Sequence, residues 1–400
     1  MTGKMNLKTH IQMVAGCAFL LLFSQCVEPF HPELDESEAS PLLVVEGLIT
    51  DQTGPFGVRL SSTLPVYDQP NEVTDFPLIS GAQVQISDDA GHLYILPEKE
   101  AGWYETEEQD LRGIPGNTYY LTISTLDGLQ YESSGVLMQE VPPIDSVYFK
   151  EGISTYFEKE RVYTTNYLEI QVDTRAPDDE IRYYKWEFEE TWEMEMPTYI
   201  RVDHGTGEGD PSPTMEHVEV DYERRHCYVS ESSRSVLVNS TLDTPAEGIK
   251  GFVLQSIGPP DDRLNIRYSI LVKQYVMDSH MYGFFRKIRE SNEETGGIYE
   301  KAPAKILGNI SCCNGDKQAL GYFMASAEQQ YRIFIQAGEH RVPKGSVYAE
   351  CGWTSSPPRG VRYIPYGTYN NGSETALSRN SFCTDCRARG SHEQPDFWDQ

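Results

Sequence analysis

Cys26 carries the clearest chemical signal in this chain, because its thiol is placed to accept a membrane-anchoring lipid. Two lysines, Lys4 and Lys8, precede a mostly apolar run over residues 11–23, and Ser24-Gln25 lead into the cysteine. This order is typical of a secretory signal that is cut just before the cysteine. The apolar run is too short to cross a bilayer, which takes about 20 residues. We expect residues 1–25 to be a lipoprotein signal peptide and Cys26 to carry the lipid; ordinary secretion, with Cys26 unmodified, is the alternative.

Six further cysteines remain after that cut, and an oxidising compartment favours disulfide bonds among them. These candidates are Cys227, Cys312, Cys313, Cys351, Cys383 and Cys386. Neighbouring cysteines at 312 and 313 are badly placed to bond each other, so each needs a distant partner or stays free. The Cys-Thr-Asp-Cys spacing at 383–386 also suits zinc or a redox pair. We favour disulfides, because no second ligand pair and no thioredoxin-like pattern accompanies this motif.

Short motifs that mark common enzymes are missing from the sequence. It has no Gly-x-Ser-x-Gly elbow, no His-Glu-x-x-His pair, no Walker loop and no dinucleotide-binding glycine fingerprint. Two weaker possibilities are a buried catalytic acid at Glu190 and a metal-binding set at His217, Glu219 and Asp221. A hydrogen-bonded structural carboxylate and a solvated strand edge are the commoner roles of such residues. We therefore predict no catalytic residue, no metal and no cofactor.

Large apolar and charged residues alternate between positions 184 and 196. The even positions are mostly large and apolar: Tyr184, Trp186, Phe188, Trp192, Met194 and Met196. The odd positions are mostly charged: Lys185, Glu187, Glu189, Thr191, Glu193 and Glu195. Because successive side chains of a strand point to opposite faces, this pattern predicts a strand with one aromatic face and one acidic face. Glu190 is the exception, since its even position directs it inward.

The rest of the chain divides into two β-rich parts. Residues 26–41 form an acidic tether whose charges and prolines leave little to pack. Short strands separated by turns fill residues 42–140 and indicate an antiparallel β-sandwich. Pro142-Pro143 predict an extended hinge. Residues 141–400 follow as a second β-rich domain, with one helix at about 279–294 capped by Ser279 and a cysteine-containing, irregular C-terminal wrap from Cys351 onward.

The charge balance argues against some partners. The chain has 61 acidic and 33 basic residues, and its net charge of −28 disfavours nucleic acid and anionic lipid headgroups. After residue 26 no apolar run is long enough to span a membrane. Membrane attachment would therefore depend on the lipid at Cys26.

A series of short blocks supports a family resemblance. They include Leu-Val-Val-Glu-Gly-Leu-Ile-Thr at 43–50, Pro-Pro-Ile-Asp-Ser-Val-Tyr at 142–148 and Tyr-Tyr-Lys-Trp-Glu-Phe-Glu-Glu-Thr-Trp at 183–192. Further blocks lie at 81–84, 116–121, 268–275, 308–310, 320–323, 383–386 and 395–398. In this order, the blocks resemble the Bacteroidota lipoproteins classed as domain of unknown function 4249.

The resemblance implies a mainly β protein whose first domain is an immunoglobulin-like or carboxypeptidase-regulatory-like sandwich. It also implies an outer-membrane lipoprotein, with the extracellular face favoured, that serves as an accessory or ligand-binding partner of a TonB-dependent transporter. The family offers no catalytic residues to carry over, so we expect a non-enzymatic surface protein. A surface hydrolase acting on glycans or peptides and a structural or adhesive module are the alternatives.

Overall fold

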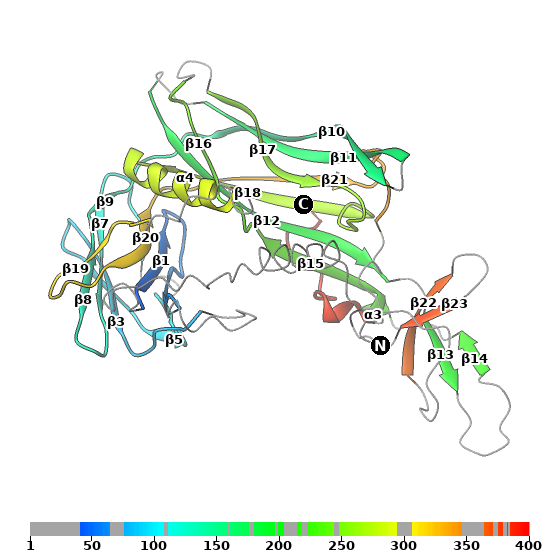
Figure 1. The fold of residues 1–400 in the computed structure, drawn as a ribbon, viewed down its shortest axis with the longest axis horizontal. Helices are drawn as coiled ribbons and strands as arrows, with labels where there is room; N and C mark the ends of the chain where they lie inside the picture. The colour runs from blue at the N-terminus through cyan, green and yellow to red at the C-terminus, as the bar shows by residue number, and fades with distance from the viewer. Residues whose placement is uncertain are drawn as a thin grey trace, which may run out of the picture. The chain divides into compact units, whose positions relative to one another are not determined.

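A computed structural model describes most of the chain between residues 41 and 399 (Figure 1). The residues outside this description are 1–40, 65–75, 108–110, 159–160, 176–179, 197–198, 204–213, 218–221, 244–247, 294–305, 346–363, 371–374, 379–381, 383–384 and 400. Side chains are also outside it at 158, 199–203, 214–217, 222, 293, 364–370 and 375–378. The fold is mainly β, as the sequence predicts. Cys26, Cys351, Cys383 and the acidic tether lie outside the described residues.

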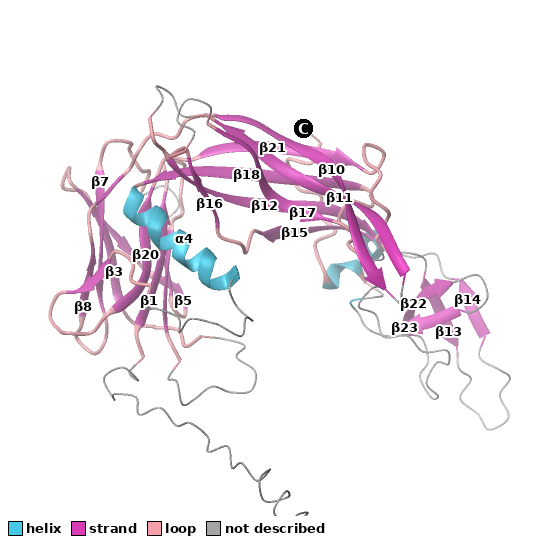
Figure 2. Ribbon diagram, turned by 45° about the horizontal axis from the view of Figure 1, so that its top comes forward, coloured by secondary structure: helices cyan, strands magenta, loops and turns pink. Residues whose placement is uncertain are grey.

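The first β-sandwich consists of two sheets around one core (Figure 2). One sheet has the order β20-β1-β2-β6-β5, formed by Ala319–Ala325, Leu43–Ile49, Gly57–Ser62, Trp103–Glu105 and Glu98–Glu100. The other has the order β19-β8-β7-β3-β4, formed by Ile310–Cys312, Gln130–Ser133, Thr118–Ser124, Gln83–Asp88 and Leu93–Leu96, and β9 (Val136–Leu137) also pairs with β7. Fully buried side chains from both sheets, such as Val45, Leu60, Ile86 and Leu121, make the shared core.

Two strands of this sandwich come from far along the chain. β20 runs parallel to β1, from Leu43 opposite Ala319 to Ile49 opposite Ala325, and β19 extends the other sheet at β8. The sequence prediction placed residues 310–325 in the second domain, because alternation identifies a strand but not the sheet that it joins. Gly321 has φ +92°, and a Cβ there would lie 1.9 Å from the carbonyl oxygen of Val45. Glycine is therefore what lets the two strands approach.

The second part of the chain also has two sheets around one core. One has the order β10-β11-β17, formed by Ile144–Glu158, Arg161–Thr174 and Ile249–Ile257. The other has the order β15-β12-β18-β21, formed by His226–Ser232, Tyr183–Glu195, Arg267–Met277 and Gln329–Gln336, and β16 (Leu237–Ser240) also pairs with β12. A further sheet joins β14 (Thr214–His217), β13 (Tyr199–Asp203), β22 (Ile364–Asn370) and β23 (Thr375–Ser378). Its last two strands lie in the segment that we expected to be irregular.

β12 confirms the predicted alternation. Its even positions from Tyr184 to Met194 are all buried, including Trp186 at 0 % exposure and Glu190 at 3 %, and so is Met196, directly after the strand. The odd positions are half-buried or exposed, apart from Thr191, which is buried. The aromatic face therefore packs into the core of the second part, and the charged face points away from it.

α4 (Ser279–Glu293) confirms the predicted helix, and in Figures 1 and 2 it lies beside β1 and β20. Met281 and Phe284 are buried in the core of the first sandwich. The cap differs from the prediction: Asp278 Oδ1 accepts a hydrogen bond from the backbone N–H of Met281 at 2.8 Å, so Asp278 rather than Ser279 caps the helix. Within the described residues, no helix combines the length and apolar character needed to span a membrane. α3 (Tyr222–Arg225) and a 3-10 turn, Cys386–Ala388, complete the helical elements there.

A disulfide holds the end of the chain against β15. Cys227 and Cys386 are bonded across a sequence separation of 159, with their Cα atoms 5.7 Å apart. Backbone hydrogen bonds between Tyr228 and Ser391 continue this contact. Cys312 and Cys313, which we included among the bridge candidates, are free cysteines in the structure. Their segment forms β19 and the turn after it, where Cys313 is exposed.

Candidate functional site

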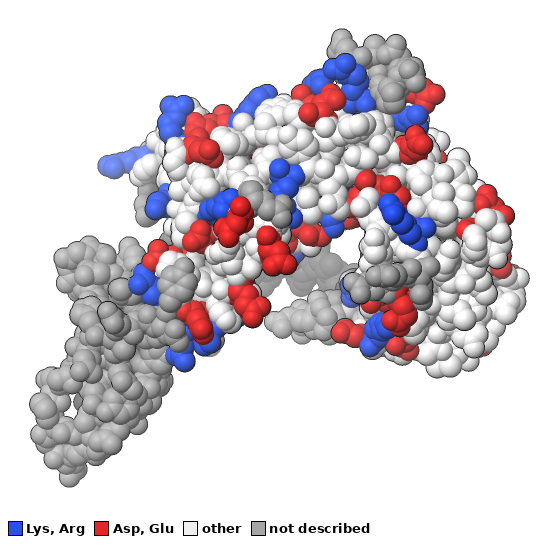
Figure 3. Space-filling model, turned by 180° about the vertical axis from the view of Figure 1, so that it is seen from behind, with Lys and Arg blue, Asp and Glu red and all other residues white. Residues whose placement is uncertain are grey.

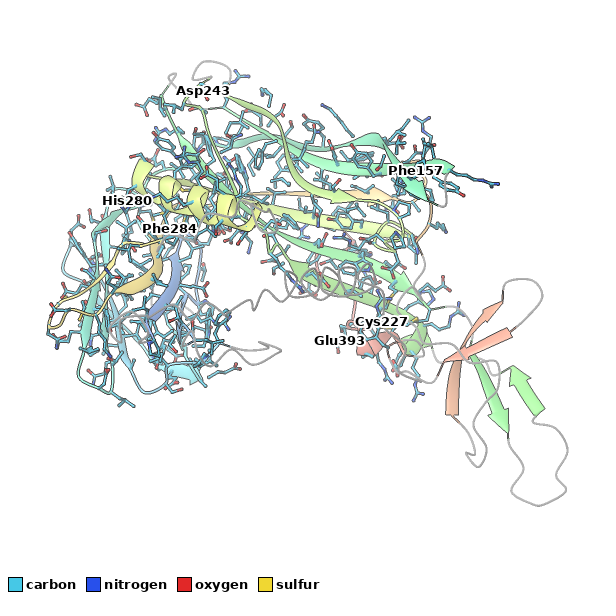
Figure 4. The ribbon with its side chains drawn as sticks, viewed as in Figure 1. Phe157, Cys227, Asp243, His280, Phe284 and Glu393 are labelled. Atoms are coloured by element: carbon cyan, nitrogen blue, oxygen red, sulfur yellow. A yellow bond between two sulfur atoms is a disulfide. The ribbon has the colours of Figure 1, made fainter. Side chains whose placement is uncertain are left out.

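A groove of about 770 Å³ lies between α4 and the outer face of the β20-β1-β2 sheet. Figure 4 labels Phe284 on α4, at the side of the helix near β1 and β20. Strands β6 and β12 contribute further side chains to the groove. Pockets of roughly 300–1,000 Å³ are the usual size for small-molecule sites. The groove is therefore large enough for a ligand.

The strand periodicity explains why β1 lines this groove. Leu43 and Val45 point into the sandwich core, whereas Val44, Glu46 and Leu48 alternate with them and line the groove. A strand that faced water on its outer side would carry polar residues there. Val44 and Leu48 are apolar instead because α4 covers part of this face, and Leu48 packs against the same cluster as Phe284.

Aromatic rings form much of the groove wall. The ring of Phe284 lies 5.2 Å from that of Tyr322 and 5.2 Å from that of Phe285, measured between centroids. Trp103 is 37 % exposed and lines the groove. A Cβ at Gly57 would lie 2.0 Å from the indole of Trp103, so the glycine allows this ring to lie against β2. The wall thus offers exposed ring surface that a ligand can cover.

The charged side chains that β12 contributes to the groove already have partners. Lys185 forms an ion pair with Glu187, and its Nζ lies 5.1 Å from the ring centroid of Phe285. The hydroxyl of Tyr275 donates to Glu328 Oε2 at 3.1 Å and lies 3.5 Å from Glu187 Oε2. Burial and the nearby carboxylates raise the pKa of Tyr275, so the phenol stays protonated as a donor.

Strands β1 and β2 contribute two further charged side chains to the groove. Glu46 and Arg59 face each other across β1 and β2, and both are exposed. Within the part of the chain that the structure describes, Arg59 forms no ion pair. A guanidinium without an ion-pair partner is available to an incoming group.

A second polar cluster surrounds Glu190, and its members bond one another around this buried carboxylate. Glu190 Oε1 accepts from Arg263 Nη1 at 2.7 Å, and Glu190 Oε2 accepts from the hydroxyl of Tyr268 at 2.7 Å. Arg263 also donates from Nε to both oxygens of Asp261 at 2.9 Å. The predicted inward, hydrogen-bonded Glu190 is confirmed.

The electrostatics of this cluster favour a fixed charge state. Burial raises the pKa of Tyr268 well above its usual value, and the charge of Glu190 raises it further. Burial lowers the pKa of Arg263, but Asp261 and Glu190 outweigh this effect and hold it above its usual value. The cluster therefore consists of a permanent cation, its carboxylate partners and a neutral phenol, with little room for a substrate at a carboxylate that is 3 % exposed.

A third feature is the end of the β10–β11 hairpin, residues 152–157 and 162–167, which we call the hairpin arm. β17 pairs with β11 only between Leu168 and Thr174, so no third strand borders the arm on that side within the described residues. Phe157 and Val162 are opposite each other and are 72 % and 65 % exposed. The rings of Tyr156 and Tyr163 stack at 5.5 Å on the other face. Figure 4 labels Phe157 at the end of this hairpin.

The surface charges are mixed. On the face seen in Figure 3, acidic and basic side chains of the described residues are interspersed. Among the described residues, no group of three or more His, Cys, Asp and Glu side chains is placed to hold a metal ion. Glu219, Asp221 and the side chain of His217 lie outside the described residues.

The groove residues were missed at the level of sequence. Arg59, Trp103 and Phe284 belong to elements that are distant in the chain, and none stands in a recognisable motif. One signal was present: the outward positions Val44 and Leu48 are apolar, which indicates that something covers this face of β1.

Comparison with known proteins gives one match. A family model described as Domain of unknown function (DUF4249) matches residues 27–332, a span that contains the groove, the Glu190 cluster and the hairpin arm. No curated protein and no solved structure matches the chain.

Proposed function

Because this chain belongs to the family described as Domain of unknown function (DUF4249), a description that assigns no activity, we propose from its structure that it is a non-enzymatic binding protein of the cell envelope. The ligand lies in the groove between α4 and the β20-β1-β2 sheet. The main observation behind this proposal is that the groove combines a volume of about 770 Å³, aromatic and aliphatic walls, and the exposed guanidinium of Arg59. Sites of this composition are typical of small-molecule binding.

Binding is favoured over catalysis because the carboxylates of Glu187 and Glu190 already have partners. A surface hydrolase acting on glycans would usually need two carboxyl groups in the groove, one of them protonated to act as the general acid. Glu46 and Glu187 both line it, but Glu187 is held by Lys185 and lies near the hydroxyl of Tyr275. Glu190, the other inward acid of β12, is bonded to Arg263 and Tyr268.

A groove-filling variant tests the ligand-binding function. Leu320 lines the groove and is half-buried, so Leu320→Trp should occupy part of it. The same change at Leu137, which is 52 % exposed on β9 and does not line the groove, is the matched control. Nile red, a neutral apolar dye, should bind the wild type and Leu137→Trp but not Leu320→Trp. Equal binding by all three proteins would contradict a site in the groove.

The proposal places the protein at the outer membrane, held by lipid on Cys26, with the extracellular face favoured. Several acyl chains on one cysteine suffice for stable anchoring, because each buried methylene contributes about 0.8 kcal/mol. Labelled palmitate should mark the wild-type protein and not Cys26→Ala. Equal labelling of both would remove the anchor from the proposal.

The proposed partner is a TonB-dependent transporter, and the hairpin arm is its contact. Exposed apolar and aromatic residues on both faces of a β-ribbon are typical of a surface that a partner buries. The protein purified from detergent-solubilised outer membranes should bring down a barrel of this class, and Phe157→Ser with Val162→Ser should reduce the yield. A yield unchanged by this double variant would place the contact elsewhere, and consistent absence of the barrel would exclude the partnership.

A further inference from the structure

We infer that the groove takes an anionic amphiphile, with an apolar body along α4 and one carboxylate at Arg59. This inference rests on the proposed ligand-binding function of the same groove and names the class of ligand. Two observations support it. The apolar side chains of the groove are only partly buried, and the two cations among the described residues that line it, Lys185 and Arg59, differ in their pairing.

Part of the apolar wall of the groove is still exposed to solvent. Phe285 and Ile288 are half-buried, although they pack against the cluster that contains Phe284 and Tyr322. Leu320, which also lines the groove, is half-buried as well. Ile306 and Leu48 extend the same surface and are also half-buried. An alkyl chain against these side chains would remove the remaining apolar area from water.

The two cations of the groove differ in their pairing. Lys185 has a side chain that is only 14 % exposed, holds an ion pair with Glu187 and lies over the rings of Phe285 and Tyr275. Arg59 is exposed and forms no ion pair within the described residues. Its planar guanidinium matches both oxygens of a carboxylate. The head group of the ligand therefore belongs at Arg59 rather than at Lys185.

Glu46 and Arg59 should affect the binding of an anion in opposite directions. Glu46 faces Arg59 across the strand pair without forming an ion pair within the described residues, so its charge repels an anionic head group. Removing the charge of Arg59 should weaken carboxylate binding, and removing the charge of Glu46 should strengthen it. Both positions are exposed, so neither neutral variant disturbs the core.

The experiment measures decanoate binding to the full chain by isothermal titration calorimetry at low ionic strength. Arg59→Gln should weaken binding about tenfold, as expected for loss of one charged hydrogen-bonding group. Glu46→Gln should tighten it about twofold to fivefold, and about 1 M salt should diminish both effects, because the screening length is then about 3 Å. Octanoate should bind about fifteenfold more weakly than decanoate, at about 0.8 kcal/mol for each missing methylene.

Decan-1-ol and decylammonium provide the matched controls, since they keep the alkyl chain and change the head group. The affinity for decanol should be the same in both variants as in the wild type. The affinity for decylammonium should rise in Arg59→Gln and fall in Glu46→Gln, the opposite of decanoate. The inference is overturned if decanoate and decanol bind the wild type equally, or if the two variants shift decanoate in the same direction. It is also overturned if decanoate does not bind while Nile red still distinguishes Leu320→Trp from Leu137→Trp; that result keeps the binding function and rejects only the ligand class.

Discussion

Both faces of β12 carry glutamates, but the glutamates of the two faces have different roles. On the inner face, Glu190 is 3 % exposed, and both of its oxygens accept hydrogen bonds. On the outer face of the same strand, Glu187 has a side chain that is 39 % exposed and borders the groove. The difference teaches that the inner carboxylate serves the structure, because a buried charge must be partnered, whereas the outer one pairs with Lys185 and stays partly exposed to solvent.

The largest expected effect tests the inner face. Arg263→Met removes the cation beside Glu190 and should cost about 3–5 kcal/mol of unfolding free energy, because it leaves a buried charge uncompensated. Lys273→Met is the matched control: Lys273 pairs with Glu189, whose side chain is 50 % exposed. That pair should contribute at most about 1 kcal/mol. Denaturant titration measures both variants, and equal losses would contradict the distinction between the faces.

A double variant sharpens this first test. Combining Arg263→Met with Glu190→Met removes both charges and should recover part of the lost stability, since a buried ion pair is often replaced by apolar residues without loss. No recovery would show that Glu190 contributes mainly through Tyr268 rather than through the ion pair.

The disulfide should stabilise β15, the strand that borders β12, without affecting the groove. Replacing Cys227 and Cys386 by Ser together should lower the unfolding free energy by about 2–5 kcal/mol. Replacing Cys312 and Cys313 should change it by less than about 0.5 kcal/mol, because they form no bridge. Nile red binding should survive both changes at a temperature where the proteins stay folded. Loss of dye binding in the folded Cys227/Cys386 variant would show that the groove depends on this bridge.

Asp173 on β11 lies between the two glutamates in exposure, because its side chain is 19 % exposed. Burial raises its pKa, but bonds from the backbone of Gly251, from Tyr148 and from Lys250 outweigh this and hold the pKa below the ordinary 3.8. Because the folded-state value is the lower one, its stabilisation is present above about pH 4 and is lost as the pH falls through that folded-state value.

Asp173→Asn should therefore lower stability at neutral pH by about 1 kcal/mol and flatten the dependence of stability on pH in acid. Thermal unfolding between neutral and acidic pH measures this, with Asp243→Asn as the control at an exposed acid in the loop after β16. If Asp173→Asn lost stability at acidic pH as steeply as the wild type, the hydrogen bonds assigned to Asp173 would be contradicted.

A small expected change in unfolding free energy concerns the outer face of β12. Glu187→Gln keeps the side-chain shape but removes the charge with which Lys185 pairs. Because the Glu187 side chain is 39 % exposed, the change should cost at most about 1 kcal/mol of unfolding free energy. Glu190→Gln, at the inner face of the same strand, should cost more because it removes the charge that Arg263 needs. Denaturant titration compares the two variants, and a comparable loss in both would remove the contrast between the faces.

Some elements could be read directly from residue order. The alternation around Trp186 predicts β12, and the apolar stripe containing Met281, Phe285 and Ile288 predicts α4, because period 2 and period 3.6 are local properties. The inward position of Glu190 follows from the same period as the rest of β12. Its partners do not, since Arg263 and Tyr268 lie 73 and 78 residues further along the chain.

By itself, the sequence determined where strand β12 and helix α4 lie and which face of each is apolar, because hydrophobic periodicity is a property of neighbouring residues. It did not predict strands β22 and β23, which lie in the segment expected to be irregular. Only the tertiary structure decided that Ala319–Ala325 returns to pair with Leu43–Ile49, that Cys227 bonds Cys386 and that Arg59 shares a groove with Phe285. Those outcomes depend on contacts between distant segments, and such contacts are selected by how the complete set of apolar faces packs together.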